Sequence, residues 1–457
     1  NFRAGVNAGN SIASGGVGNV LVGDEAGTAI TTGDYNVALG YSALPADTLG
    51  SRSTAIGVSA LESQNFTTAT NAYNTAVGYS AGSTVTTGIQ NTLIGGIAGD
   101  AITTGDENVT VGYNSLTTNT KSFYNVAVGN SALAAHNLTS DAAGYNTGIG
   151  HNAGAAITTG VSNTLIGGLA GDALTDADHN VAVGYAALTA DTYGSRSVAI
   201  GQSALYAQNF TTATNGYNTA VGDGAGYAVT TGVHNTLIGA AAGDALTDAD
   251  HNVAVGYATL TTDTLGSKST ALGYATLFAQ NFTTATDSYN TAVGYSAGNA
   301  VTTGQYNTLL GGSAGDSLTT GASNTAVGYA ALATEDAHGL NTAVGSRALY
   351  TLNAGADSYN VAVGNDAGYL MTTGTRNTII GGLAGDAITT GAKNVAVGTS
   401  AMSTNILGSR SVAVGDSALA TQNSATAVDM YNTAVGHGAG SAVTTGTGNT
   451  FVGGLAG

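Results

Sequence analysis

Two serines stand in a pattern that carries the nucleophile of many hydrolases. The segment Gly78 to Gly82, with Ser80 at its centre, fits G-x-S-x-G, and Ser296 lies in a second match. In hydrolases this pattern forms a sharp turn that exposes the serine for attack on an acyl carbon. Elsewhere in this chain the same position is filled by Asn152, Gly224, Asp366 and Gly438. We therefore interpret the match as a by-product of a repeat, and we predict no enzyme activity and no catalytic residue.

Clustered carboxylates suggest a second kind of chemistry, the binding of calcium. Asp172, Asp176 and Asp178 recur 72 residues later as Asp244, Asp248 and Asp250. Carboxylate oxygens are the ligands that Ca²⁺ prefers. The spacing differs from the Gly-rich nonapeptide of calcium β-rolls, and the equivalent segment 101–104 has lost the carboxylates. We favour a solvated acidic edge over a calcium site, and we predict no cofactor.

Three segments combine an aromatic ring with amides that could contact a partner. Gln64 to Thr67 has the sequence Gln-Asn-Phe-Thr, which recurs at residues 208–211 and 280–283. Each lies in a four-residue extension of a repeat unit, and an insertion into a tight coil should bulge outward. The candidate surface contacts are Asn65, Phe66, Asn209, Phe210, Asn281 and Phe282. The alternative is that the three Phe rings fold back and seal the groove between neighbouring chains.

Tyrosine is more frequent than the formation of a short coil requires. Eight Tyr, such as Tyr79, follow a recurrent Gly, and nine, such as Tyr73, precede a recurrent Asn. A Tyr at the edge of a repeat can fill a groove between chains while its hydroxyl stays in water. Contact with carbohydrate is the alternative interpretation.

All these residues lie on a repeat that runs through the whole chain. The motif Asn-x-Ala-Val-Gly-x-x-Ala-(Gly/Leu) occurs in 26 copies, the first ending its strand at Gly5 and the last at Gly453. From Gly78 the motif glycines are separated by 17, 17, 17 and 21 residues, and this block of 72 residues recurs. A fixed period of this kind indicates a stacked repeat architecture.

The spacing within one copy predicts a short strand followed by turns. Around Gly78, Thr75 and Val77 should face one side and Asn74 and Ala76 the other. Thr-Thr-Gly segments between the copies are typical of turns. We predict an all-β fold, a parallel β-solenoid (β-roll) of about 26 coils, as one continuous domain over residues 1–457 of a longer fibre protein. At ~4.8 Å per coil the rod should be about 120 Å long, and residues 72 apart, such as Val77, should share a column.

The recurrent Asn predicts a ladder that holds the coils together. It opens 22 of the 26 copies, and stacked Asn side chains can hydrogen-bond from coil to coil. Ser replaces it at four positions, each directly after a basic residue: Arg52, Arg196, Lys268 and Arg410. We expect these basic residues to pair weakly with acidic rows formed by Asp100, Asp172, Asp244 and Asp316.

Composition separates this chain from several classes of protein. Its 457 residues include 70 Gly and one Pro but no Cys, and the net charge is −18. This charge argues against a nucleic acid or an anionic membrane as partner, and no run of about 18 apolar residues exists to span a bilayer. A coil of 17 residues encloses little volume, so we expect neighbouring chains to cover its apolar sides in a homotrimer.

The motifs resemble those of two families of fibrous proteins. Ser197 to Gly201 and Asn125 to Gly129 are similar to head repeats of trimeric autotransporter adhesins, which form parallel β-rolls in a homotrimer. Asn-Thr-Ala-Val-Gly-Tyr copies with Thr-Thr-Gly linkers resemble repeats of phage tail fibres that end in an intramolecular chaperone. The resemblance implies an extracellular fibre on a virion or bacterial surface that attaches to a host glycan or protein receptor. We expect a phage tail fibre, with an adhesin head and a passive spacer or self-assembling filament as alternatives.

Overall fold

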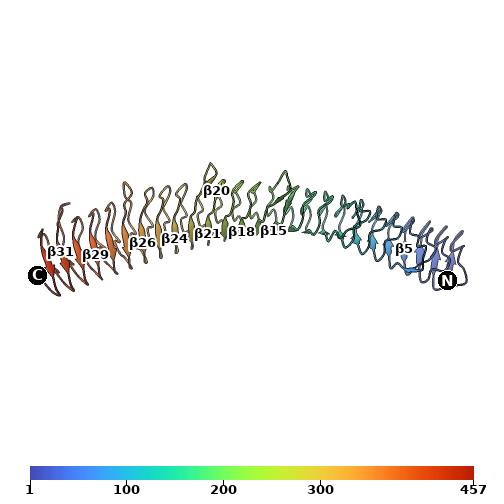
Figure 1. Cartoon of the computed structure of the whole chain (residues 1–457), viewed down its shortest axis with the longest axis horizontal. Coiled ribbons are helices and arrows are strands. Elements are labelled where there is room, and N and C mark those ends of the chain that lie inside the picture. Colours follow the sequence, from blue (N-terminus) through green and yellow to red (C-terminus); the bar gives the residue numbers. More distant parts are fainter. The chain divides into compact units, whose positions relative to one another are not determined.

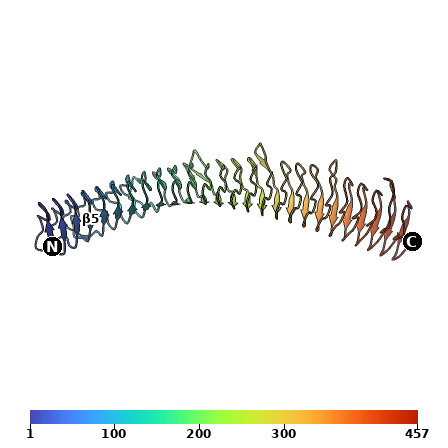
Figure 2. The same cartoon turned by 180° about the vertical axis from the view of Figure 1, so that it is seen from behind.

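The computed structural model describes residues 1–457, which form strands but no helix. Its contacts divide the chain into two compact units, Asn1–Thr231 and Gly232–Gly457. Each unit is a parallel β-solenoid, in which the strands line one side of a stack of coils and the loops line the other (Figures 1 and 2). The predicted fold class is therefore confirmed. No helix is present that could cross a membrane.

Each unit contains one long parallel sheet to which every coil contributes a three-residue strand. In the first unit these strands are β1 (Phe2–Ala4), β2 (Val20–Val22), β3 (Val37–Leu39), β5 (Thr54–Ile56), β7 (Thr75–Val77), β8 (Thr92–Ile94), β9 (Val109–Val111), β10 (Val126–Val128), β11 (Thr147–Ile149), β12 (Thr164–Ile166), β13 (Val181–Val183), β15 (Val198–Ile200) and β17 (Thr219–Val221). In the second unit they are β18 (Thr236–Ile238), β19 (Val253–Val255), β21 (Thr270–Leu272), β23 (Thr291–Val293), β24 (Thr308–Leu310), β25 (Thr325–Val327), β26 (Thr342–Val344), β27 (Val361–Val363), β28 (Thr378–Ile380), β29 (Val395–Val397), β30 (Val412–Val414), β31 (Thr433–Val435) and β32 (Thr450–Val452).

Three of the longer coils add a small parallel sheet of their own. The pairs are β4 (Gly50–Ser51) with β6 (Thr70–Asn71), β14 (Gly194–Ser195) with β16 (Thr214–Asn215), and β20 (Gly266–Ser267) with β22 (Thr286–Asp287). The loop beside β20 stands above the neighbouring coils in Figure 1. The extra residues therefore build a side strand as well as a bulge.

The strand register follows the sequence period. Val77 pairs with Ile94, Ile94 with Val111, Val111 with Val128, and Val128 with Ile149. Residues 72 apart thus share one column four coils apart, as predicted.

The two faces of each strand have different environments. Ala76 is fully buried in the core and Asn74 lies beside it, whereas Thr75 and Val77 face outward and are half-buried. This alternation is the one that the sequence predicted. It places Ala in most coils, and Leu in others such as Leu93, inside a narrow coil and leaves mainly β-branched residues on the outer face of the sheet.

The motif glycine is fixed by its backbone and by the next coil. Gly184 has a φ of 139°, which L-residues rarely adopt, and an added Cβ would lie 2.4 Å from the carbonyl oxygen of Gly201. A side chain at this position would therefore collide with the coil stacked on it.

Core volume is shared between two positions of the coil. Where the motif ends in Gly, as at Gly171, the next inward residue is apolar, and Leu174 fills the space above the glycine. Where the motif ends in Leu, as at Leu188, that inward residue is polar, and Asp191 is fully buried there. Most coils follow this rule in alternating pairs, so buried polar residues recur along the core.

The predicted Asn ladder exists, but it is made largely through the backbone. Oδ1 of Asn74 accepts from the backbone N of Asn91 at 2.9 Å, and Nδ2 of Asn91 donates to the carbonyl of Gly105 at 2.9 Å. Direct amide pairs occur in only some coils, such as Asn108 to Asn91 at 3.2 Å. Each Asn therefore fastens one coil to the next by satisfying buried main-chain groups.

The expected pairing of the basic row with Asp100, Asp172, Asp244 and Asp316 is wrong. Each basic side chain instead contacts the side strand or extension of its own longer coil: Arg52 with Asn71, Arg196 with Asn215, Lys268 with Asp287, and Arg410 with Asp429. The four Asp residues lie in another column, because they follow the strand whereas the basic residues precede it. The sequence alone had not shown that the residues before the strand and those after it lie at different corners of the coil.

Candidate functional site

The three candidate Phe rings lie inside their own coil. Phe210 is 4% exposed and packs over the backbone of Gly194, where an added Cβ would lie 2.6 Å from Cδ2 of the ring. Phe66 and Phe282 are buried to the same extent. The rings therefore offer almost no exposed surface in the single chain, and the expected outward bulge of Phe is wrong. They fold back as in the alternative, although the groove that they fill belongs to one chain.

A buried carboxylate holds the start of each of these extensions. Oδ1 of Asp191 accepts from the backbone N of Gly194 at 3.0 Å and of Phe210 at 3.1 Å, while Oδ2 accepts from Nε2 of Gln208 at 2.6 Å. Asp47 and Asp263 make the same contacts in their coils. Burial raises the pKa of Asp191, and the Gln208 hydrogen bond opposes this rise. The network is structural, since Asp191 and Gln208 are fully buried.

The Asn residues beside the Phe rings are the exposed part of the candidate surface. Asn65, Asn209 and Asn281 are exposed, and each Oδ1 accepts from a Thr one coil earlier, at 3.0 Å for Thr48 and Asn65. The extension thus presents polar groups to solvent over an aromatic anchor. Binding of a partner by these three Asn remains a prediction.

Two residues that the sequence had not singled out occupy equivalent positions in other blocks. His136 takes the place of Gln208, is fully buried, and neither ring nitrogen has a hydrogen-bond partner. Burial lowers its pKa to about 4. Glu335 takes the place of Asp191, and burial raises its pKa. Comparison of residues 72 apart would have identified both positions.

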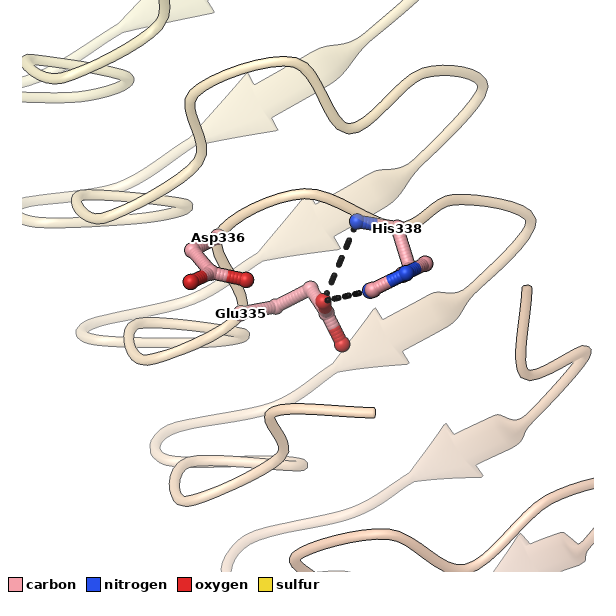
Figure 3. Close-up of side chains that lie close together, drawn as sticks. All are labelled: Glu335, Asp336 and His338. Carbon is pink, nitrogen blue, oxygen red and sulfur yellow. Dashed lines mark hydrogen bonds and ion pairs between the residues drawn. The ribbon is translucent and has the colours of Figure 1, made fainter. Parts of the chain in front are cut away.

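Only one group of three potential metal ligands lies close together. It consists of Glu335, Asp336 and His338, whose ligand atoms lie within 4.8 Å of one another (Figure 3). Oε1 of Glu335 lies 3.6 Å from Nδ1 of His338 and accepts from the backbone N of His338 at 3.2 Å, while Oε2 accepts from the backbone N of Ala354. Both carboxylate oxygens thus serve as caps for main-chain donors, as the Asp191 oxygens do.

The acidic cluster considered for calcium does not converge. Oδ1 of Asp172 accepts from Oγ1 of Thr189, Asp176 accepts from Thr159 at 2.6 Å, and Asp178 accepts from the backbone N of Val161 at 2.8 Å. The three carboxylates therefore contact different parts of neighbouring coils.

The serines of the hydrolase-like pattern occupy an ordinary position of the coil. Ser80 and Ser296 both have a φ of 51°, and Asn152 and Asp366 have a φ of 56° at the same position. The left-handed turn therefore belongs to the repeat and not to a specialised serine.

Tyrosines form exposed ladders on the coil surface. Tyr257, Tyr274 and Tyr295 stand in successive coils, with ring centroids 5.5 and 5.2 Å apart and nearly parallel planes. All three side chains are exposed. A ladder of this kind presents ring edges and hydroxyls along the solenoid, a surface that suits either a neighbouring chain or a carbohydrate.

A groove of about 480 Å³ lies in the second unit among coils of β24 to β27. Residues from four coils line it, among them Asp316, Tyr329, Ala333, Arg347, Tyr350 and Tyr369. Its volume falls within the range of about 300–1,000 Å³ that is usual for small-molecule sites.

Comparisons with known proteins do not add to this description. The chain matches no protein-family model, and no curated protein is significantly similar to it. Function is therefore inferred from the repeat and its surfaces.

Proposed function

We propose that the chain is a segment of an extracellular fibre, of the phage tail-fibre kind, that assembles as a homotrimer and attaches to a host surface. The observation that carries this proposal is the outer face of the long sheet. The third residue of each strand faces outward, and in β8 and β12 the residues Ile94 and Ile166 are each 37% exposed. Val, Ile or Leu stands at this position in nearly every coil.

A continuous apolar row of this length favours association with further copies of the chain. Exposed apolar patches of more than a few hundred Å² are uncommon on monomers and mark interaction surfaces. Covering the row with two identical neighbours would bury it along each unit and leave the loops on the side opposite the strands facing outward (Figure 1). The attachment function then belongs to those outer surfaces.

Light scattering on the purified chain tests the assembly, and three chains per particle are expected. Ile94→Lys with Ile166→Lys places two charges in the row and should yield monomers. Val58→Lys is the matched control, because Val58 is 42% exposed but follows a motif Gly outside the strand. A wild-type monomer that binds no apolar dye would refute the trimer.

Attachment is tested separately by incubating the labelled protein with bacterial cells. Saturable retention on cells supports an attachment fibre. Retention on no cell type or glycan surface would favour the passive spacer.

A further inference from the structure

The repeat supplies an internal comparison for the groove. In three blocks an Asp that follows the strand accepts a hydrogen bond from a Thr one coil further along: Asp100 from Thr117, Asp172 from Thr189, and Asp244 from Thr261. In the next block the Asp is retained as Asp316, but the Thr is replaced by Ala333. The carboxylate of Asp316 has therefore lost the donor that its counterparts have.

Ala333 lines the groove, and the lost Thr leaves the Asp316 carboxylate as an acceptor in its wall. The side-chain carboxylate of Asp316 accepts no hydrogen bond from the chain, and burial alone raises its pKa. A ligand that donates hydrogen bonds from its hydroxyl groups is stabilised by a partly buried carboxylate that has no other donor. Ser313, Ser317 and Thr334 add hydroxyls to the same groove.

The other wall is aromatic and carries a fixed cation. Tyr350 and Tyr369 are stacked with centroids 5.4 Å apart, and Tyr329 is 65% exposed. The guanidinium of Arg347 lies 5.0 Å from the centroid of Tyr369, where Nη2 donates to Oδ2 of Asp366 at 2.8 Å. The groove thus combines apolar ring surface, a carboxylate and a guanidinium.

The equivalent coils of the first unit show which residues are special. Tyr185, Tyr206 and Tyr227 correspond to the three groove tyrosines, and Tyr206 and Tyr227 are also stacked, at 4.9 Å. Thr189 stands where the groove has Ala333, and Ser203 where it has Arg347. The three hydroxyl residues of the groove, Ser313, Ser317 and Thr334, are also replaced, by Leu169, Ala173 and Ala190. Five replacements therefore distinguish the groove from the tyrosine surface of the first unit.

We propose that this groove binds a neutral saccharide, with sugar hydroxyls donating to Asp316 and a C–H face of the sugar ring against Tyr329 and Tyr350. Arg347 already occupies the cation position over Tyr369, which disfavours an ammonium ligand. Asp316 and the net charge of −18 disfavour an anion. A neutral polyol satisfies the carboxylate and the guanidinium without placing a charge in the groove. Four coils, at ~4.8 Å each, leave room along the axis for a short oligosaccharide.

This inference rests on the proposed attachment function, since it assigns the ligand class of one site on the fibre. The test is a titration of the full chain with four neutral sugars: maltotetraose, cellotetraose, chitotetraose and mannotetraose. Binding is monitored by Tyr fluorescence and by saturation-transfer NMR. Fluorescence reports on Tyr because the chain has no Trp. At least one sugar should bind saturably.

Three variants locate the binding. Ala333→Thr restores the residue of the other blocks and should weaken binding about ten-fold or more, which corresponds to about 1.4 kcal/mol, without lowering the thermal midpoint. Asp316→Asn keeps the shape of the groove, removes an acceptor oxygen and should also weaken binding. Ala134→Thr makes the same change at the same coil position in the first unit, and its affinity should equal that of the wild type.

Three results would overturn the inference: no sugar binds at millimolar concentration, Ala333→Thr binds as tightly as wild type, or tetramethylammonium binds in the groove and sugars do not. Retention of the labelled proteins on cells distinguishes failure of the groove assignment from failure of the proposed attachment function. If cells retain the Ala333→Thr variant fully while no sugar binds the wild type, the groove assignment fails and the attachment function stands. If cells retain neither protein while a sugar binds the groove, attachment fails and the groove assignment stands.

Discussion

Replacement of His136 by Gln should remove a specific loss of stability in acid. His136 is fully buried without a partner for either ring nitrogen, and burial lowers its pKa from 6.5 to about 4. His136 therefore becomes protonated below about pH 6.5 in the unfolded chain but only below about pH 4 in the folded chain. Stability contributed by the neutral imidazole is complete above that pH and is lost as the pH falls toward about 4.

The size of this effect follows from the shift in pKa. A difference of about 2.5 units at about 1.4 kcal/mol per unit amounts to about 3 kcal/mol, of which about 2.5 kcal/mol is lost by about pH 4.5. Gln64 and Gln208 occupy the same position in other blocks, so Gln fits the coil and does not titrate. His179→Gln is the matched control, because His179 is exposed.

The assay is hydrogen exchange of the coils around His136 at about pH 7 and about pH 4.5, because stacked repeats can open locally. The wild type and His179→Gln should lose opening free energy between the two conditions by about 2.5 kcal/mol more than His136→Gln. Equal losses in all three proteins, or an NMR titration that places the His136 pKa near 6.5, would refute the argument.

Three further substitutions, the first with a matched control, test the core. Gly201→Ala should destabilise its coils by about 3 kcal/mol or more in urea denaturation, because φ is 134° and the Cβ would lie 2.3 Å from the carbonyl oxygen of the next coil. Gly224→Ala should cost less, about 1–2 kcal/mol, because φ is 62° but no atom lies within 4 Å of the added Cβ. Phe210→Ala should cost about 3–5 kcal/mol and lower the melting temperature, since the ring is buried. Burial raises the pKa of Asp191, so stability should fall as the pH rises from its unfolded pKa through its folded pKa, and Asp191→Asn, which copies Asn405, should flatten that fall in the urea midpoint.

The sequence predicted the architecture because the length of the repeat determines which residues stack on one another. A strand has a side-chain period of two and a stack has one coil per repeat, so Val77 and Ile149 had to share a column once the 72-residue block was known. The motif Gly was likewise marked by its invariance, although the collision with the next coil that enforces it is visible only in the structure.

The direction of the extensions could not be predicted from their length. An insertion bulges outward only if its side chains have no inward site, and Asp191, Gln208 and Gly194 create such a site for Phe210. The sequence did carry a signal that this region is buried. Each Ser that replaces the ladder Asn is followed eleven residues later by a Gln: Gln64 after Ser53, Gln208 after Ser197, Gln280 after Ser269, and Gln422 after Ser411.

That covariation has a physical cause in the geometry of the ladder. Ser53 is too short to reach the groups that Asn reaches, and Gln64 replaces it by donating from Nε2 to Ser53 at 2.9 Å and accepting from Asn74 at 2.8 Å. The neighbouring basic residue Arg52 changes together with Ser53 in sequence but contacts Asn71 on the surface. The coupled change at Ser53 and Gln64 therefore identified the longer coil correctly. The acidic partner predicted for Arg52 on the surface was wrong.

The groove illustrates how side-chain replacements alone can vary the surface of a solenoid. Every residue of a coil has a counterpart above and below it at a fixed distance, so a cavity appears wherever one column loses a side chain while its neighbours keep theirs. Ala333 is such a loss, because Thr occupies the position in the three preceding blocks and fastens the Asp beneath it. The Asn ladder continues past Ala333, since the backbone N of Asn341 donates to Oδ1 of Asn324 at 3.1 Å. Recognition can therefore differ between blocks while the Asn ladder, the motif Gly and the buried Asp keep the stack unchanged.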